Sequence, residues 1–193
     1  MKVKKVALTR RIEETKVLHI DEWAKVSLSD VHFDNGNTIT DFLLVKIFGN
    51  GYVAVCSRLS NGRFLFVRQC RPVSEMSIEL IAGGCPDGII PEEQVLEEMI
   101  AETGYKPGRL IRINKFGFFT QNDRIENRCH LFLAFDCVPT SEIRKQDEKQ
   151  GVDVIILTPQ EVLQKIKNGE IKDIATLAGI FAHFTYEVSP ALF

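Results

Sequence analysis

Short runs of apolar residues, separated by polar turn residues, fill the first 70 positions of the chain. The alternation favours strands at residues 16–20, 23–28, 31–33, 41–48, 52–59 and 63–69. Asn61-Gly62 separates the last two runs, and Asn-Gly between apolar runs is the strongest short-range signal for a hairpin. The N-terminal third is therefore predicted to be rich in β-structure.

The spacing of apolar residues changes to a helical period after Pro91. Proline suits the first turn of a helix, and Gly104 is well placed to end it, so residues 91–103 are predicted to be helical. Further strands are expected at residues 111–118, 129–137 and 152–157. A capping box at Thr158–Glu161 opens a second helix over residues 159–167, and a third is expected over 174–186. Strands, one helix, more strands and then helices make an α+β fold.

Composition narrows the class of protein. The 193 residues are 45% hydrophobic and 26% charged, which suits one globular domain with a small appendage. The net charge is −2 and no basic block occurs, so we expect no nucleic-acid partner. No run of eighteen apolar residues and no apolar signal core is present, so we expect no membrane association and a cytoplasmic location.

The cysteines and histidines favour structural roles. None of the five cysteines forms a C-x-x-C pair or a zinc-finger spacing, so buried, reduced thiols are expected. His130 lies in an apolar strand and is expected to be a satisfied structural histidine.

The candidate chemistry lies on the helix over residues 91–103. On a helical wheel, one arc carries Val95, Leu96, Met99 and Ile100, and the opposite arc carries Glu97, Glu98 and Glu102. Glu98 and Glu102 stand one turn apart and repel each other. A divalent cation between them would relieve the repulsion and attract a diphosphate. The alternative is an acidic helix face that is merely solvated.

The stretch from Glu79 to Tyr105 resembles the Nudix box, G-x5-E-x7-R-E-U-x-E-E-x-G-U, where U is aliphatic or aromatic. The positions of the box that match are Gly83, Glu98, Met99, Glu102, Gly104 and Tyr105. Three positions depart from the pattern, because Ile89, Glu97 and Ala101 stand where the box has glutamate, arginine and glutamate.

Segments outside the box extend the resemblance to the ADP-ribose pyrophosphatases of the Nudix superfamily. Residues 79–83, Glu-Leu-Ile-Ala-Gly, are similar to the E-L-P-A-G of these enzymes, and residues 67–72 are similar to their V-K/R-Q-F/Y-R strand end. Residues 127–134, the segment from 169 to 177 and Trp23-Ala-Lys-Val also resemble segments of that family. The resemblance runs from about residue 20 to the C-terminus.

This resemblance implies a Nudix fold with a mixed β-sheet sandwiched between helices. It implies an N-terminal β-arm, residues 1–48, that takes part in a homodimer, followed by a Nudix hydrolase domain, residues 49–193. It also implies hydrolysis of the diphosphate of a nucleoside diphosphate sugar such as ADP-ribose. The products are a nucleoside monophosphate and a sugar phosphate, and the cofactor is Mg²⁺ or Mn²⁺.

Matched residue by residue, the resemblance implies metal ligands at Glu98, Glu102 and the backbone carbonyl of Ala82. Glu98 is also expected to be catalytic. The family's general base lies in a loop that corresponds to residues 119–127, where Glu126 and Asp123 are both candidates. Trp23 is expected to stack on the nucleotide base. Arg71 is expected to contact phosphate or sugar, with a surface ion pair as the alternative.

The departures at Ile89, Glu97 and Ala101 support a second hypothesis. A Nudix fold that has lost turnover can bind or sense a nucleotide without hydrolysing it. On the helical wheel, Glu97 lies one turn before Ala101, so it could replace the missing charge only in part, and we do not favour that replacement.

Overall fold

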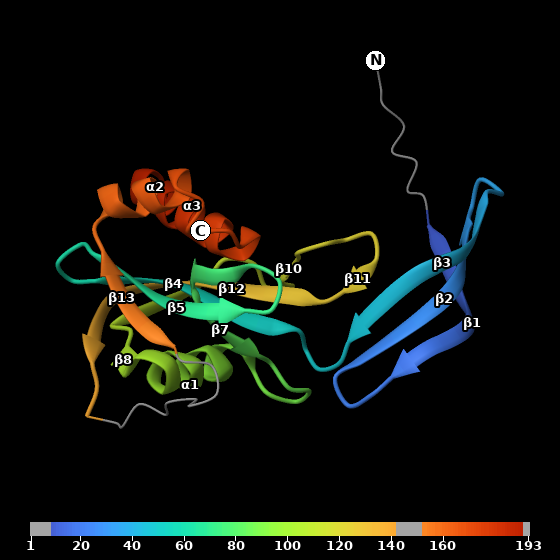
Figure 1. Ribbon diagram of the computed structural model, residues 1–193, viewed down its shortest axis with the longest axis horizontal. Coiled ribbons are helices and arrows are strands. Elements are labelled where there is room, and N and C mark those ends of the chain that lie inside the picture. Colours follow the sequence, from blue (N-terminus) through green and yellow to red (C-terminus); the bar gives the residue numbers. More distant parts are fainter. Residues whose placement is uncertain (1–8, 142–151, 191–193) are drawn as a thin grey trace, which may run out of the picture. The chain divides into compact units, whose positions relative to one another are not determined.

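The computed structural model describes residues 9–141 and 152–190, and Figure 1 shows their arrangement. These residues form two compact units. One contains the chain up to Phe48 together with Gln121–Asn127, and the other contains Gly49–Thr120 and the chain from Arg128 onward. Residues 121–127 belong to the N-terminal unit, because they contain a short strand that pairs with another strand of that unit. The sequence does not predict this, since the two paired segments lie far apart along the chain.

The N-terminal unit is a four-stranded sheet in the order β1-β2-β3-β11. Its strands are β1 Arg10–Ile20, β2 Ala24–Phe33, β3 Thr38–Ile47 and β11 Ile125–Glu126. The first three are antiparallel neighbours, and β11 pairs parallel to β3. β1 is an edge strand, and every residue along it is exposed, including Ile12, Val17, Leu18 and Ile20.

The larger unit is built on a nine-stranded mixed sheet whose central order is β10-β12-β4-β5-β13. The five strands of this path are β10 Phe118–Phe119, β12 Arg128–Pro139, β4 Tyr52–Leu59, β5 Phe64–Arg71 and β13 Asp153–Leu157. The other four are β6 Glu75–Glu79, β7 Ile81–Gly84, β8 Tyr105–Lys106 and β9 Arg109–Arg112. β4 pairs parallel to β12 and antiparallel to β5 and β7, so the sheet is mixed.

Three helices cover the two faces of this sheet in the described part of the chain (Figure 1). α1 Pro91–Thr103 packs Val95 and Met99 onto one face, together with Val53, Val55 and Phe132. α2 Pro159–Lys167 and α3 Ile174–Val188 pack onto the other face, over Phe64, Phe66 and Leu131. Alternate residues of β4 and β5 enter opposite cores, as the two-residue period of a strand requires. The expected α+β sandwich is confirmed.

The ends of the helices lie close to the predicted positions. α1 begins with Pro91, and Gly104 ends it in the left-handed conformation, at φ 73°, where its N–H donates to the carbonyl of Ile100. α2 begins at the predicted capping box: Thr158 accepts from the backbone N–H of Glu161, and the Glu161 carboxylate accepts from the N–H of Thr158. Helix starts are encoded locally, which is why the sequence predicts them well.

One predicted strand, residues 111–118, is wrong. β9 ends at Arg112, because the Asn114 side chain accepts a hydrogen bond from the backbone N–H of Phe116 and forms a turn. Gly117 then adopts a positive φ of 73°, and pairing resumes only at the short β10.

Buried thiols are found at four of the five cysteines, whereas Cys70 is exposed on β5. Among the described residues, no helix is long and apolar enough to cross a membrane.

His183 is a buried histidine on α3 for which the sequence gives no partner. Its ring is 0% exposed and lies 5.0 Å from the ring of Phe64 and 4.6 Å from that of Phe135. Neither ring nitrogen reaches a hydrogen-bond partner within the described residues. Burial and the nearby charge of Arg58 lower the pKa of His183 to about 4, so the ring is neutral at pH 7.

We expect His183→Leu to stabilise the protein at pH 7 by about 1–3 kcal/mol, because burial of unpartnered polar nitrogens is unfavourable. The unfolded chain protonates His183 near pH 6.5, but the folded protein does so only near pH 4. The wild type should therefore lose stability as the pH falls between these values, and the variant should lose less. Urea unfolding at pH 7.5 and pH 5 measures both effects. A variant that is less stable than the wild type at pH 5 would contradict this account.

Candidate active site

The two glutamates at one-turn spacing on α1 both face strand β7. The carboxylate of Glu98 lies directly over Gly83, where a Cβ atom would collide with its oxygens. The backbone N–H of Ala82 donates to the Glu102 carboxylate at 3.4 Å. The absence of a side chain at Gly83 therefore allows the carboxylates to approach the strand.

The predicted arcs of α1 need a correction. Pro91, Val95, Met99 and Thr103 form the buried line, whereas Leu96, expected on the buried arc, is 37% exposed. Glu97 is exposed, but Glu98 and Glu102 are half-buried beside the sheet. The side of α1 that carries Glu98 and Glu102 thus faces the sheet at β7. These two residues are therefore not part of a merely solvated acidic face.

Two effects of its surroundings make the Glu102 carboxylate harder to ionise. Burial, and next the negative charge of Glu98, raise the pKa of Glu102 to about 7. The Ala82 N–H and the positive charge of Arg71 oppose this rise without cancelling it. The two carboxylates therefore share a site in which one of them, Glu102, resists ionisation.

Arg71 ends β5 on the same side of the sheet. Its Nε and a terminal nitrogen donate to one oxygen of Glu79 at 2.9 and 2.8 Å, and Gln69 donates to the same oxygen at 3.2 Å. Glu79 is 8% exposed, so this ion pair is more protected than the surface ion pair weighed from the sequence. The pairing fixes the direction of the guanidinium.

A cavity of about 480 Å³ lies beside these groups. Its lining includes Tyr52, Arg71, Glu79, Ala82, Gly83, Gly84, Lys172 and Asp173. The cavity thus joins the end of β5, the strand β7 and the connection between α2 and α3, and it has the size of a small-ligand pocket.

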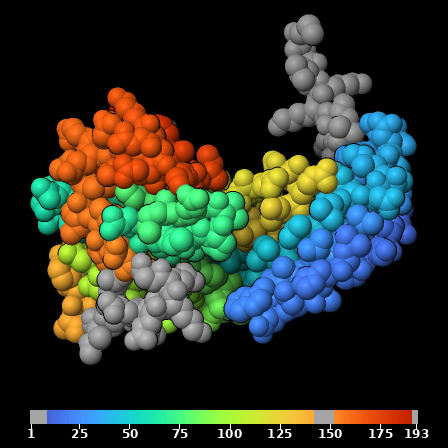
Figure 2. Space-filling model, viewed as in Figure 1, coloured from blue at the N-terminus to red at the C-terminus, as the bar shows by residue number. Residues whose placement is uncertain are grey.

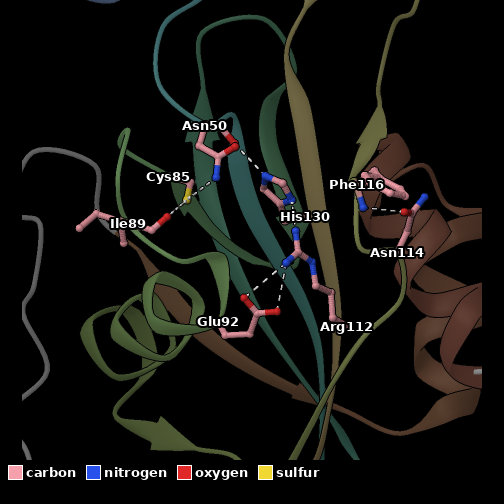
Figure 3. A network of polar contacts seen from close by, with 8 residues as sticks. All are labelled: Asn50, Cys85, Ile89, Glu92, Arg112, Asn114, Phe116 and His130. Atoms are coloured by element: carbon pink, nitrogen blue, oxygen red, sulfur yellow. Dashed lines mark hydrogen bonds and ion pairs between the residues drawn. The ribbon is translucent and has the colours of Figure 1, made fainter.

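A second polar network holds the loop between β7 and α1 (Figure 3). Arg112 donates to Glu92 on α1 at 3.1 Å and to Nδ1 of His130 at 2.7 Å. Nε2 of His130 lies 2.8 Å from the carbonyl of Asn50, which requires the tautomer with the proton on Nε2. Burial lowers the pKa of His130, in keeping with this neutral ring and with its predicted structural role.

The loop itself is tied to the sheet through Cys85. The backbone N–H of Asn50 donates to the Cys85 carbonyl at 2.7 Å, and the Cys85 N–H donates to the carbonyl of Gly51 at 2.9 Å. Figure 3 shows the Cys85 thiol directed at the carbonyl of Ile89. The loop before α1 is thus fixed to the turn before β4, and the first turn of α1 is fixed to β9.

The chain was compared with families of known proteins. The family model described as NUDIX domain matches residues 50–177. The chain belongs to the Nudix family.

Three relatives are similar to most of this Nudix chain. It is 31% identical over 131 residues to an ADP-ribose pyrophosphatase of Bacillus subtilis, covering 67% of this chain and 70% of the relative. It is 29% identical to a methanol dehydrogenase activator of Bacillus methanolicus, covering 81% and 82%. It is 27% identical to a GDP-mannose pyrophosphatase of Pectobacterium atrosepticum, covering 86% and 89%. The predicted class, a Nudix pyrophosphohydrolase similar to ADP-ribose pyrophosphatase, is confirmed.

A solved structure described as an ADP compounds hydrolase has the same fold. Its TM-score is 0.73 at 13% identity, with 96% of this chain and 97% of the other covered. The predicted Nudix fold is thereby confirmed.

The three departures from the Nudix box occupy different surroundings. Ile89 is 40% exposed in the loop before α1, Glu97 is exposed, and Ala101 is half-buried. In the part of the chain that the structure describes, no group of three or more His, Cys, Asp or Glu side chains is placed to hold a metal ion. Ile89 and Ala101 supply no carboxylate at two positions where the Nudix box has glutamate.

The remaining candidates belong to the N-terminal unit. Trp23 follows the β1–β2 turn and is 72% exposed, so a flat aromatic face is available to a ligand. Glu126 lies on β11 opposite Lys46, whose ammonium is 3.8 Å from the Glu126 carboxylate. Asp123 forms an exposed ion pair with Arg124 at 3.9 Å. The sequence did not reveal that these residues share a unit with the β-arm.

The raised pKa of Glu102 makes a testable pH dependence. A glutamate in the unfolded chain ionises near pH 4.5, and folded Glu102 near pH 7, so metal-free wild type should lose stability as the pH rises between these values. Glu102→Gln should remove this loss and be more stable by up to about 3 kcal/mol at pH 8, with little difference near pH 4.5. Chemical unfolding in a chelating buffer checks this. Glu97→Gln is the control, and an equal gain there would refute the buried-pair explanation.

Proposed function

We propose that this chain hydrolyses the diphosphate of a nucleoside diphosphate sugar such as ADP-ribose, releasing a nucleoside monophosphate and a sugar phosphate. The observation that carries the proposal is the pair Glu98 and Glu102, held against Ala82 and Gly83 beside a cavity with cationic side chains. The names of the relatives, an ADP-ribose pyrophosphatase and a GDP-mannose pyrophosphatase, support this substrate class.

The residues present fit a divalent cation, Mg²⁺ or Mn²⁺. Burial, and next the charge of Glu98, raise the pKa of Glu102, and a cation between the two carboxylates would offset both effects. Glu98, Glu102 and the backbone carbonyl of Ala82 are the groups that we propose hold it. When bound, such a cation shields phosphate charge, polarises the phosphoryl oxygens and helps to activate water.

Other residues of the chain bind and orient the substrate in this proposal. Arg71, fixed by Glu79, directs its remaining N–H donors into the cavity and binds phosphate or sugar. The network of Glu92, Arg112 and His130 keeps α1 and its loop at a fixed position on the sheet. Such pre-organisation matters because charge that develops in the transition state is stabilised best by groups that do not have to move.

The N-terminal unit supplies two further roles in the proposal. Glu126 acts as the general base that takes a proton from the attacking water, with Asp123 as the other candidate from the same loop. Trp23 stacks on the nucleotide base, for which its 72% exposed ring is suited. If these roles are right, Trp23→Ala raises KM more than it lowers kcat, and Glu126→Gln does the reverse. Unchanged kinetics in either variant would remove that residue from the mechanism.

We also propose that the chain is a homodimer that uses its β-arm. Among the residues that the structure describes, β1 pairs only with β2, and it exposes four large apolar residues, a surface that a second copy can cover. The described part of this unit is a four-stranded sheet alone, which has little core of its own. Light scattering at micromolar concentration should give the mass of two chains, and the mass of one chain would contradict this.

The central test is a hydrolysis assay on a panel of nucleotide sugars with Mg²⁺ or Mn²⁺. Turnover should be abolished by chelation. Glu98→Gln and Glu102→Gln should each lower kcat by about 10²-fold or more, because each removes a charge from the proposed cation site while keeping the shape of the side chain. Glu97→Gln is the matched control on the same helix and should stay within a few-fold of the wild type. Full metal-dependent turnover by Glu98→Gln or Glu102→Gln would overturn the assignment.

The alternative function is a Nudix fold that binds a nucleotide without turnover. Ala101 and Ile89, which remove two carboxylates of the box, favour it, and one relative bears the name of a methanol dehydrogenase activator. The same panel separates the two functions. Tight nucleotide binding without release of products would support the alternative.

A further inference from the structure

The cavity beside β7 contains two cations and two carboxylates, and three of these four charges are already engaged. Glu79 binds Arg71 through one oxygen at 2.9 and 2.8 Å, so their charges compensate each other. Asp173 caps α3, because one of its oxygens accepts from the backbone N–H and the hydroxyl of Thr176 at 2.7 and 2.9 Å. The carboxylate of Asp173 therefore occupies the positive end of α3, which is closed to another anion.

Lys172 is the fourth charge, and its contact is of another kind. Its ammonium donates to the backbone carbonyl of Ser74 at 2.7 Å. Within the described ranges, Lys172 forms no ion pair with a carboxylate. A carbonyl leaves the full positive charge in place, and an ammonium has three N–H donors, of which this bond uses one. Lys172 thus brings to the cavity a positive charge that no ion pair within the described residues holds, with two donors to spare.

The backbone around Lys172 is fixed on both sides. Ile171, before it, is 4% exposed in the core under α2 and α3, and Asp173, after it, is the helix cap. The N–H of Ile78 on β6 donates to the carbonyl of Glu170 at 2.9 Å. In Figure 2 the green segment that follows β5 lies against the C-terminal helices, in agreement with these bonds. A cation placed in advance loses less conformational freedom when it binds a ligand.

We propose that Lys172 binds a phosphate oxygen of the diphosphate in this cavity, as a substrate-binding residue that lies outside the Nudix box. The inference rests on the proposed function. Ala82 and Gly83 line the same cavity and contact Glu102 and Glu98, so an anion held by Lys172 lies next to the carboxylate pair. Lysine binds phosphate as a point charge, which suits an anion with several equivalent oxygens.

The test compares K172M and K172Q with two controls. K172M removes the charge, K172Q removes it but keeps a donor for the Ser74 carbonyl, and K172R keeps the charge. K167M makes the same charge change at an exposed lysine of α2 outside the cavity. We expect both neutral variants to raise KM for a nucleotide sugar by about tenfold or more, with kcat within a few-fold of the wild type. K172R should recover most of the loss, and K167M should match the wild type.

A binding measurement separates this inference from the proposed function. Calorimetry with inorganic pyrophosphate and Mg²⁺ should show weaker binding in K172M and K172Q than in K167M, at equal melting temperatures. If the wild type hydrolyses nucleotide sugars but the neutral Lys172 variants keep its KM and pyrophosphate affinity, the inference is overturned and the function stands. If no nucleotide sugar is hydrolysed but the neutral Lys172 variants still weaken pyrophosphate binding, the function fails and Lys172 remains an anion-binding residue.

Discussion

The closeness of two carboxylates to β7, which has no side chain at Gly83, is the constraint on which the site depends. Glu98 lies over Gly83 and Glu102 meets the N–H of Ala82, so α1 packs with two negative charges beside β7. Partial burial of like charges is unfavourable unless a cation or a proton intervenes. Burial and the charge of Glu98 raise the pKa of Glu102 to about 7, so below this pH a proton removes one of the two charges. Burial of Val95 and Met99 in the core stabilises the packing of α1 and offsets this unfavourable term.

The arginines at the end of β5 and on β9 are already bound to other groups. Arg71, whose positive charge opposes the raised pKa of Glu102, is held by Glu79. Arg112 is held between Glu92 and His130, and together they fix the loop before α1. Arg71 and Arg112 are therefore not free to turn toward the carboxylates of Glu98 and Glu102. Perturbed acids held in this way beside a cavity are typical of functional sites.

The local features of this chain follow from its sequence, and the distant contacts do not. The start of α1 at Pro91, its end at Gly104 and the capping box of α2 depend on residues within one turn, so the predictions for them succeed. The strand expected over 111–118 fails because the turn at Asn114 outweighs the apolar pattern. The contact of Lys172 with Ser74 spans 98 positions and that of His130 with Asn50 spans 80. Such pairs depend on the topology of the sheet, which periodicity alone does not encode.

The missing box carboxylates determine what kind of cation site the protein can offer. Glu97 is exposed and one turn before Ala101, so it does not lie with the half-buried pair, and the charge absent at 101 is not restored. Magnesium retains several waters and is commonly bound by one or two carboxylates together with substrate phosphates. Two carboxylates and a backbone carbonyl are therefore sufficient if the diphosphate completes the coordination. On this argument, cation and diphosphate stabilise each other's binding, and the cations of the cavity matter more than in a site with a full set of glutamates.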